Sequence, residues 1–222
     1  MYAMEAVILA GGESLRMKPH VWIPKPLVEI NNGMTLLEWQ VSWLHRHGFD
    51  HIIVMTRGFR IPELDVMWVE SKPEWGTGGA LKRALQLCEE EYVYALNCDD
   101  ILLYNPKDIF RMARKVVTVV ITRPRSPWGV VLLRGAQIAG FTEKPMLDFW
   151  VSAGHYLWHR ESAIEALPFK GDLERYTLPM LAANGLAWAY KLEPGVKPVW
   201  LTVNNYKELL YVRKVLAELE SF

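Results

Sequence analysis

Several basic side chains follow a pair of glycines near the start of the chain, in a pattern that suits phosphate chemistry. An apolar run, Ala6–Ala10, is typical of a fully buried strand, and the glycines come directly after it. The next loop, Ser14–Val28, contains Arg16, Lys18, His20 and Lys25 and no carboxylate. Because glycine lets a ligand approach the backbone closely, we expect a phosphate site at the carboxyl end of this strand, where ligands of open α/β sheets usually bind.

A second glycine-rich turn and two adjacent carboxylates occur further along the chain. Residues 74–81, Glu-Trp-Gly-Thr-Gly-Gly-Ala-Leu, are predicted to open a helix, and a flat ring could lie on backbone that lacks side chains. Asp99 and Asp100 follow the predicted buried strand Tyr92–Asn97. Magnesium favours a few carboxylates together with phosphate oxygens, so Asp99 is a candidate magnesium ligand. For Asp100, a solvated turn or a helix cap is an equal alternative.

A third pattern combines a carboxylate and an ammonium group. Residues 141–145, Phe-Thr-Glu-Lys-Pro, follow Trp-Gly-Val-Val at 128–131. A carboxylate such as Glu143 can orient several hydroxyl groups, and an ammonium such as Lys144 suits a phosphate as a compact charge. The alternative is a surface ion pair at the end of a hairpin.

Composition limits the classes of protein to consider. The length of 222 residues fits one α/β domain or two very small ones, and we expect a single domain over residues 1–222. The chain is 51% hydrophobic and 23% charged, as in a soluble protein with a sizeable core. Lys and Arg (25) balance Asp and Glu (25), which argues against a nucleic-acid or anionic-membrane surface but allows a small anion pocket. Two cysteines are too few for a disulfide framework. We see no signal peptide or membrane span, and we expect a cytoplasmic protein.

The order of the predicted elements indicates the architecture. Apolar runs that alternate with helical periodicity predict a largely parallel, helix-covered sheet. Thr35 and Glu38 have the spacing of a capping box at the start of a helix. Gly129–Leu133 and Ile138–Thr142 are predicted to form an antiparallel hairpin, and Asp172–Asn184 is predicted to form a helix.

These motifs together resemble the sugar-1-phosphate nucleotidyltransferases, also called sugar-nucleotide pyrophosphorylases. Residues 9–17, LAGGESLRM, are similar to an LAGGxGTRL-type opening, and residues 24–27, PKPL, to the segment that follows it. Residues 76–81 resemble the family's GTAGAL segment and residues 97–99 its NGD, with cysteine in place of glycine. Residues 141–145 resemble its FxEKP.

The resemblance implies a fold, a reaction and a set of residues. The implied fold is a Rossmann-like α/β nucleotidyltransferase sheet, mostly parallel with an antiparallel hairpin and helices on both faces, in a short form without a C-terminal β-helix. The implied reaction joins a nucleoside triphosphate and a sugar-1-phosphate with Mg²⁺ and releases pyrophosphate. The implied catalytic residues are Arg16 and Lys25, and the implied metal ligand is Asp99. The implied nucleotide-binding residues are Leu9, Ala10, Gly11, Gly12, Gly76, Thr77 and Gly78. The implied sugar-phosphate-binding residues are Gly129, Glu143, Lys144 and Gly154.

The chain departs from the family's pattern at several positions. Ser14 and Leu15 replace a glycine and a threonine. Gly79 stands where a thymidylyl-specific branch has a glutamine, which predicts more room for the base and favours a purine. Thr202 replaces the aspartate that is the family's second metal ligand, and a hydroxyl is a poorer magnesium ligand than a carboxylate. The metal would then be held more weakly, be assisted by Asp100, or not be needed in the usual way.

Substrate identity stays open at this point. The first expectation is GTP with mannose-1-phosphate. One alternative is a regulatory homologue that binds a nucleotide sugar with little or no turnover, which the Thr202 substitution favours. Another is a cytidylyl- or guanylyltransferase that acts on a non-sugar phosphate. The sequence also leaves a homo-oligomer open.

Overall fold

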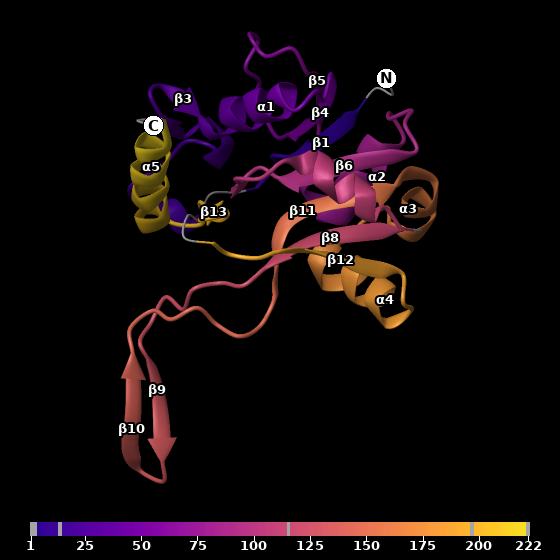
Figure 1. The fold of residues 1–222 in the computed structure, drawn as a ribbon. Helices are drawn as coiled ribbons and strands as arrows, with labels where there is room; N and C mark the ends of the chain where they lie inside the picture. Colours follow the sequence, from indigo (N-terminus) through magenta and orange to yellow (C-terminus); the bar gives the residue numbers. More distant parts are fainter. Residues whose placement is uncertain (1–3, 13–14, 115, 196–197, 221–222) are drawn as a thin grey trace.

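A seven-stranded sheet forms the centre of the molecule in the computed structural model, which describes residues 4–12, 15–114, 116–195 and 198–220 (Figure 1). The strand order is β12-β8-β11-β6-β1-β4-β5. The strands are β1 (Glu5–Leu9), β4 (His51–Thr56), β5 (Met67–Glu70), β6 (Tyr92–Asn97), β8 (Val117–Thr122), β11 (Val151–His159) and β12 (Ala187–Leu192). Only β11 runs antiparallel to its neighbours, so the expected, mostly parallel sheet is confirmed.

Helices cover both faces of this sheet. They are α1 (Leu36–Arg46), α2 (Gly76–Leu85), α3 (Arg160–Ala166), α4 (Leu178–Ala183) and α5 (Tyr206–Glu220). Successive side chains of a strand point to opposite faces, and along β1 Ala6 and Ile8 enter one apolar cluster while Val7 enters the other. Helices α1 and α5 pack on the first cluster, and α2, α3 and α4 contribute to the second.

Shorter elements connect these layers. The two-stranded sheets pair β2 (Glu29–Asn31) with β3 (Met34–Thr35), β7 (Asp100–Leu102) with β13 (Trp200–Thr202), and β9 (Val130–Arg134) with β10 (Gln137–Thr142). The short helical turns are η1 (Leu15–Met17), η2 (Lys25–Leu27), η3 (Pro73–Trp75), η4 (Pro106–Met112) and the π-helical η5 (Leu173–Thr177). No helix among the described residues is long and apolar enough to cross a bilayer.

Two local expectations have different outcomes. The capping box of α1 is confirmed, because Thr35 Oγ1 accepts from Glu38 N and Glu38 Oε2 accepts from Thr35 N. The helix predicted over Asp172–Asn184 is confirmed in its extent, because Leu173–Ala183 is helical throughout, but it is not uniformly α-helical. The segment begins as a π-helical turn, in which Leu178 N donates to the Leu173 carbonyl, and becomes α-helical only afterwards. Pro179, which has no N–H to donate, sits at this junction.

The antiparallel hairpin is also confirmed, but its position is unexpected. Strands β9 and β10 pair with each other, outside the seven-stranded sheet. Figure 1 shows them extending far from the body as an arm, which we define as residues 130–142.

Candidate active site

The largest set of expected site residues meets at the carboxyl ends of four neighbouring strands. Strands β6, β1, β4 and β5 are adjacent and parallel, so the loops that follow them lie along one edge of the sheet. A cavity of about 350 Å³ opens at this edge. It is lined by Leu9, Gly11, Gly12, Met55, Arg57, Ser71, Lys72, Pro73, Gly76, Thr77, Ala80, Asn97, Asp99, Asp172 and Glu174.

A second hollow of about 430 Å³ adjoins the first one. The two share Gly11, Gly12 and Arg57, and the second continues over Ala10 and the loop that contains Lys18. The glycine turn after β1 therefore borders both hollows. A ligand longer than either hollow could extend along this turn from one to the other.

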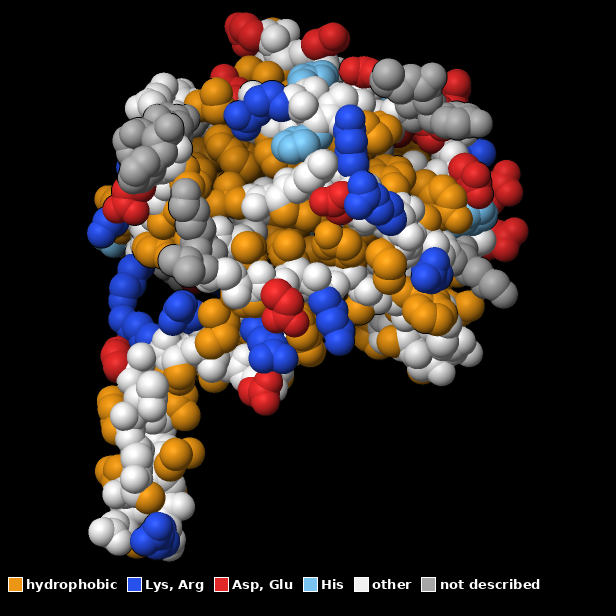
Figure 2. Space-filling view, viewed as in Figure 1, with side chains coloured by type: hydrophobic (Ala, Val, Ile, Leu, Met, Phe, Trp, Pro, Cys, Tyr) orange, Lys and Arg blue, Asp and Glu red, His pale blue; other side chains and the backbone are white. Residues whose placement is uncertain are grey.

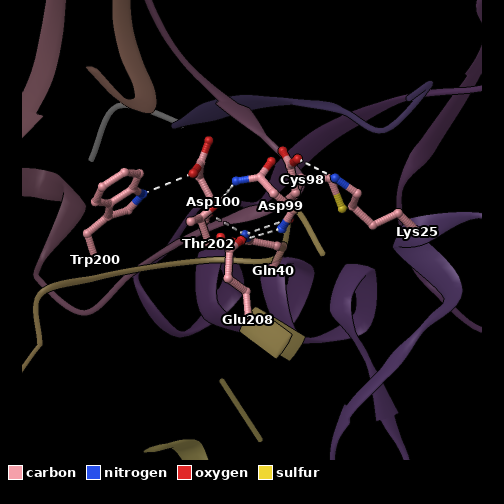
Figure 3. Close-up of polar contacts among 9 residues, drawn as sticks. Lys25, Gln40, Cys98, Asp99, Asp100, Trp200, Thr202 and Glu208 are labelled. Atoms are coloured by element: carbon pink, nitrogen blue, oxygen red, sulfur yellow. Dashed lines mark hydrogen bonds and ion pairs between the residues drawn. The ribbon is translucent and has the colours of Figure 1, made fainter. Parts of the chain in front are cut away.

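Lys25 and Asp99 form an ion pair beside the first cavity, which Asp99 lines and Lys25 does not. Lys25 Nζ lies 2.8 Å from Asp99 Oδ2, and the two side chains are 16% and 28% exposed (Figure 3). Lys25 comes from η2 and Asp99 from the turn after β6, so the fold joins two motifs that are 74 residues apart. A cation and a carboxylate thus meet where the sequence predicts a catalytic lysine and a metal ligand.

The second glycine-rich turn packs against another part of the protein. Gly78 N donates to the Gly171 carbonyl at 2.9 Å, and Thr77 Oγ1 accepts from Leu173 N at 2.7 Å. A Cβ at Gly76 would lie 2.5 Å from the Gly171 carbonyl oxygen. These glycines are therefore needed for close contact with residues 168–173, and Gly76 and Thr77 still line the cavity.

The expectation that Gly79 leaves room for a base is wrong. A Cβ at Gly79 would overlap the backbone carbonyl of Phe169. The space beside this glycine is thus filled by protein, so its lack of a side chain gives no support for a purine.

Asp100 is buried, which contradicts the expectation of a solvated turn or a helix cap. It begins β7, is 9% exposed, and its Oδ1 accepts from Trp200 Nε1 at 2.9 Å (Figure 3). Burial raises the pKa of the Asp100 carboxyl to about 7, and the charge of Asp99 adds to this effect. Hydrogen bonds from Trp200 and Thr202 oppose it.

Gly154 lies directly against this carboxylate. It has φ +73° in β11, and a Cβ at this position would overlap Asp100 Oδ2. Gly154 lines neither hollow and lies beside Asp100.

Thr202 lies opposite Asp100 in the β13–β7 pair. Its Oγ1 accepts from Asn204 Nδ2 at 2.8 Å. The position at which the family resemblance implies a second metal-binding carboxylate is thus next to a carboxyl group that the chain supplies from Asp100.

A series of buried hydrogen bonds from three side chains ends at the backbone carbonyl of Asp100. His155 Nε2 lies 2.8 Å from the Asp100 carbonyl and His155 Nδ1 lies 2.7 Å from Tyr94 Oη. Tyr94 Oη in turn lies 3.1 Å from Tyr104 Oη. His155 is fully buried, and burial lowers its pKa to about 4. A neutral ring fits this network, since Nε2–H can donate to the carbonyl while Nδ1 accepts from Tyr94.

Several expected site residues lie outside the two hollows. Arg16 is exposed on η1 and lines neither of them. Gly129, Glu143 and Lys144 flank the arm and also line neither hollow. Lys144 Nζ is 3.7 Å from Glu143 Oε1, and both side chains are more than half exposed.

Two cations at the cavity were missed by sequence reasoning. Arg57 follows β4 and its Nε donates to the Gly11 carbonyl, and Lys72 follows β5. The available signal was a basic residue just after an apolar run. This signal indicates a site residue only when the sheet order is known, in which β4 lies beside β1 and β5 lies beside β4.

The donor set fits a magnesium ion that takes most of its ligands from elsewhere. Within the described residues, no three His, Cys, Asp or Glu side chains cluster as a metal site. Asp99 does present a carboxylate to the cavity. Magnesium commonly keeps waters and substrate phosphate oxygens beside one or two carboxylates, so Asp99 could anchor the ion together with a bound triphosphate.

Comparison with known proteins identifies relatives along most of the chain. A model of the MobA-like NTP transferase domain matches residues 6–174. The mannose-1-phosphate guanylyltransferase catalytic subunit beta of Danio rerio is 28% identical over 231 residues, which cover 93% of this chain and 63% of the relative. The D-glycero-alpha-D-manno-heptose 1-phosphate guanylyltransferase of Aneurinibacillus thermoaerophilus is 26% identical, with 87% of this chain and 94% of the relative covered.

Solved structures share the fold. HddC from Yersinia pseudotuberculosis has a TM-score of 0.73 at 18% identity, and the match covers 96% of this chain and 99% of that one. A putative glucose-1-phosphate thymidylyltransferase from Bacillus anthracis has a TM-score of 0.72 at 16% identity, covering 96% and 95%. This chain therefore spans the whole fold of these structures but only 63% of the length of the zebrafish protein.

Proposed function

Because the chain belongs to the MobA-like NTP transferase family, we propose that it transfers a nucleotidyl group from a nucleoside triphosphate to a sugar-1-phosphate. The first candidate substrates are GTP and mannose-1-phosphate or a related hexose or heptose phosphate. The names of the similar guanylyltransferases from Danio rerio and Aneurinibacillus thermoaerophilus support this choice.

One observation carries the proposal. The ends of β1, β4, β5 and β6 surround a cavity with exposed glycine backbone, cations and three carboxylates, Asp99, Asp172 and Glu174. Backbone without side chains suits a nucleotide, cations suit its phosphates, and the Asp99 carboxylate suits a divalent ion. These are the groups that a reaction between two polyanions requires.

The reaction needs positioning and charge neutralisation more than proton transfer. A phosphate oxygen of the sugar-1-phosphate attacks the α-phosphorus and forms a new P–O bond, while the bond between the α-phosphorus and the bridging oxygen breaks and pyrophosphate leaves. The second pKa of such a phosphate is about 6, so the nucleophile is already mostly a dianion at neutral pH. The protein must hold the two substrates in line and offset their charge.

The positions of the cations suggest which phosphate group each one would neutralise. Lys25, which pairs with the cavity residue Asp99, would stabilise charge at the α-phosphate. Arg57 borders both hollows and would bind phosphate oxygens next to the Gly11–Gly12 backbone. Arg16 remains our candidate for the leaving pyrophosphate, which it would meet on the exposed side of the loop. Magnesium on Asp99 would neutralise charge on the phosphate oxygens.

A regulatory nucleotide-binding role is the second candidate. Two observations favour it: Lys25 already occupies one oxygen of Asp99, and Thr202 stands where the family resemblance implies a carboxylate. In that case nucleotides would bind in the same cavity with little or no turnover.

Release of pyrophosphate from a panel of triphosphates and sugar-1-phosphates with magnesium tests the proposal. We expect turnover to fall on the order of 10²-fold or more in Lys25→Ala, because a cation at the reacting phosphate is lost. Lys214→Ala, at a 73% exposed position on α5, is the matched control and should keep full activity.

Binding data separate the two candidates. Nucleotide binding by calorimetry without turnover for any pair of substrates would favour the regulatory role. A Thr202→Asp variant adds a carboxylate opposite Asp100, and a gain in magnesium affinity would support a metal position at this edge. Absence of both nucleotide binding and turnover would refute both candidates.

A further inference from the structure

The arm presents an unusual surface for a region that extends into solvent. Its two strands pair only with each other within the described chain. A two-stranded hairpin alone is marginally stable in water at best. Figure 2 shows hydrophobic side chains gathered along the arm, with a cationic side chain at its tip.

Strand register assigns these side chains to two faces. Residues directly opposite each other in an antiparallel pair share a face, and Ile138 lies opposite Leu133 while Phe141 lies opposite Val131. The four form one wholly apolar face, which we call the apolar arm face. Their exposures are 41% (Val131), 67% (Leu133), 62% (Ile138) and 65% (Phe141).

The opposite face is mixed in character. It carries Leu132 opposite Gly140, Arg134 opposite Gln137, and Thr142 opposite Val130. Leu132 is 65% exposed, nearly the same as Leu133 on the apolar arm face. The arm is therefore an amphipathic ribbon whose apolar side is uncovered in the isolated chain.

We propose that the apolar arm face is a homodimer interface, in which the arms of two copies of this chain pack face to face about a two-fold axis. Such a contact is self-complementary, because each copy contributes the same apolar surface. The charged side chain of the strands, Arg134, lies on the other face, so pairing the apolar faces brings no like charges together. A different protein partner would be expected to select its site by polar or charged groups, and the apolar arm face has none.

The available area sets the strength of this dimer. Each of the four side chains exposes on the order of 100 Å², so with the backbone between them one copy offers roughly 500 Å². Two copies would bury roughly 1,000 Å², which is the lower limit for a specific interface. The dimer should therefore form reversibly in the micromolar range and persist at high salt, because no ion pair contributes to it.

Sedimentation velocity of the full chain between about 1 and 200 µM tests this interface. We expect the wild type to shift from 25.6 kDa towards twice that mass, equally in 0.1 M and 1 M NaCl. Leu133→Glu should shift the dissociation constant by 100-fold or more. Leu132→Glu is the matched control, since it changes the neighbouring residue at the same exposure on the opposite face, and it should dimerise like the wild type.

A second pair of variants distinguishes loss of the interface from local misfolding of the arm. Ile138→Glu should also shift the dissociation constant by 100-fold or more, and Gln137→Glu should leave the dimer intact. Thermal melts should be similar for all four variants, because the arm lies outside the core. A wild type that stays monomeric at all concentrations would overturn the proposal, as would equal loss of the dimer on both faces. A monomer that floats with phosphatidylcholine vesicles would overturn it in favour of a lipid surface.

Discussion

Replacement of Gly154 by alanine should destabilise the protein through two separable effects. The first is backbone strain, because φ +73° costs an L-residue roughly 1–2 kcal/mol. The second is a collision between the new Cβ and the Asp100 carboxylate. To relieve it, Asp100 must move and weaken the 2.9 Å hydrogen bond from Trp200 Nε1, and hydrogen bonds to charged groups are worth about 1.5–3 kcal/mol. The sum predicts a loss of roughly 2.5–5 kcal/mol in unfolding free energy.

Gly185 provides a matched control for the strain alone. It has φ +67° after α4, and a Cβ there would meet nothing within 4 Å. Gly185→Ala should therefore cost only the roughly 1–2 kcal/mol of backbone strain. Urea denaturation of the two variants and the wild type, monitored by tryptophan fluorescence, gives the difference.

A double-mutant cycle then assigns the excess to Asp100. Asp100→Ala removes the atoms that collide most closely, so the double variant with Gly154→Ala should be more stable than additivity predicts, by at least about 1 kcal/mol. If Gly154→Ala and Gly185→Ala cost the same, or if the cycle is additive, Asp100 does not pack against Gly154 as described.

Three further predictions concern the cavity, the buried histidine and the first helix. Arg57→Ala should lower kcat/KM for pyrophosphate release on the order of 10²-fold, because a cation at the cavity is lost. Arg60→Ala, at an exposed position three residues later, should leave kcat/KM unchanged. Equal losses in the two variants would show that Arg57 does not act in the site. The folded-state pKa of His155, about 4, lies below its unfolded value of 6.5, so the neutral ring favours folding above pH 6.5 and this stability is lost as pH falls towards 4. His155→Gln should therefore flatten the pH dependence of unfolding free energy by about 3 kcal/mol over this window, and an unchanged slope would contradict it. Thr35→Ala should cost about 1 kcal/mol by removing the capping box, while Ser42→Ala within the same helix should cost nothing measurable in the same urea titration.

The sequence predicted the features that depend on short-range patterns. The buried strand before Gly11, the capping box at Thr35 and the hairpin in residues 129–142 each follow from periodicity or turn chemistry over a few residues. The same holds for the helix that begins at Gly76. These elements form because the local signals agree with the tertiary environment.

The sequence could not show contacts between distant segments. Gly79 was interpreted as open space because its neighbour, Phe169, is 90 residues away in the chain. Arg57 was missed because its relation to Gly11 depends on the order of strands in the sheet. Asp100 was compatible with a solvated turn until β11 and β13 were in place to bury it.

The two segments that connect the arm to the body, residues 124–126 and 145–147, are hydrogen-bonded to each other. Ser126 N donates to the Pro145 carbonyl at 2.9 Å and Leu147 N to the Pro124 carbonyl at 2.9 Å, so the outgoing and returning chains are already held together at the body. A short turn could join them there in place of the arm, and the protein without the arm would keep every strand of its central sheet. The arm could therefore be shortened, exchanged or transplanted to another scaffold, while the rest of the chain keeps the strand pairing of its central sheet.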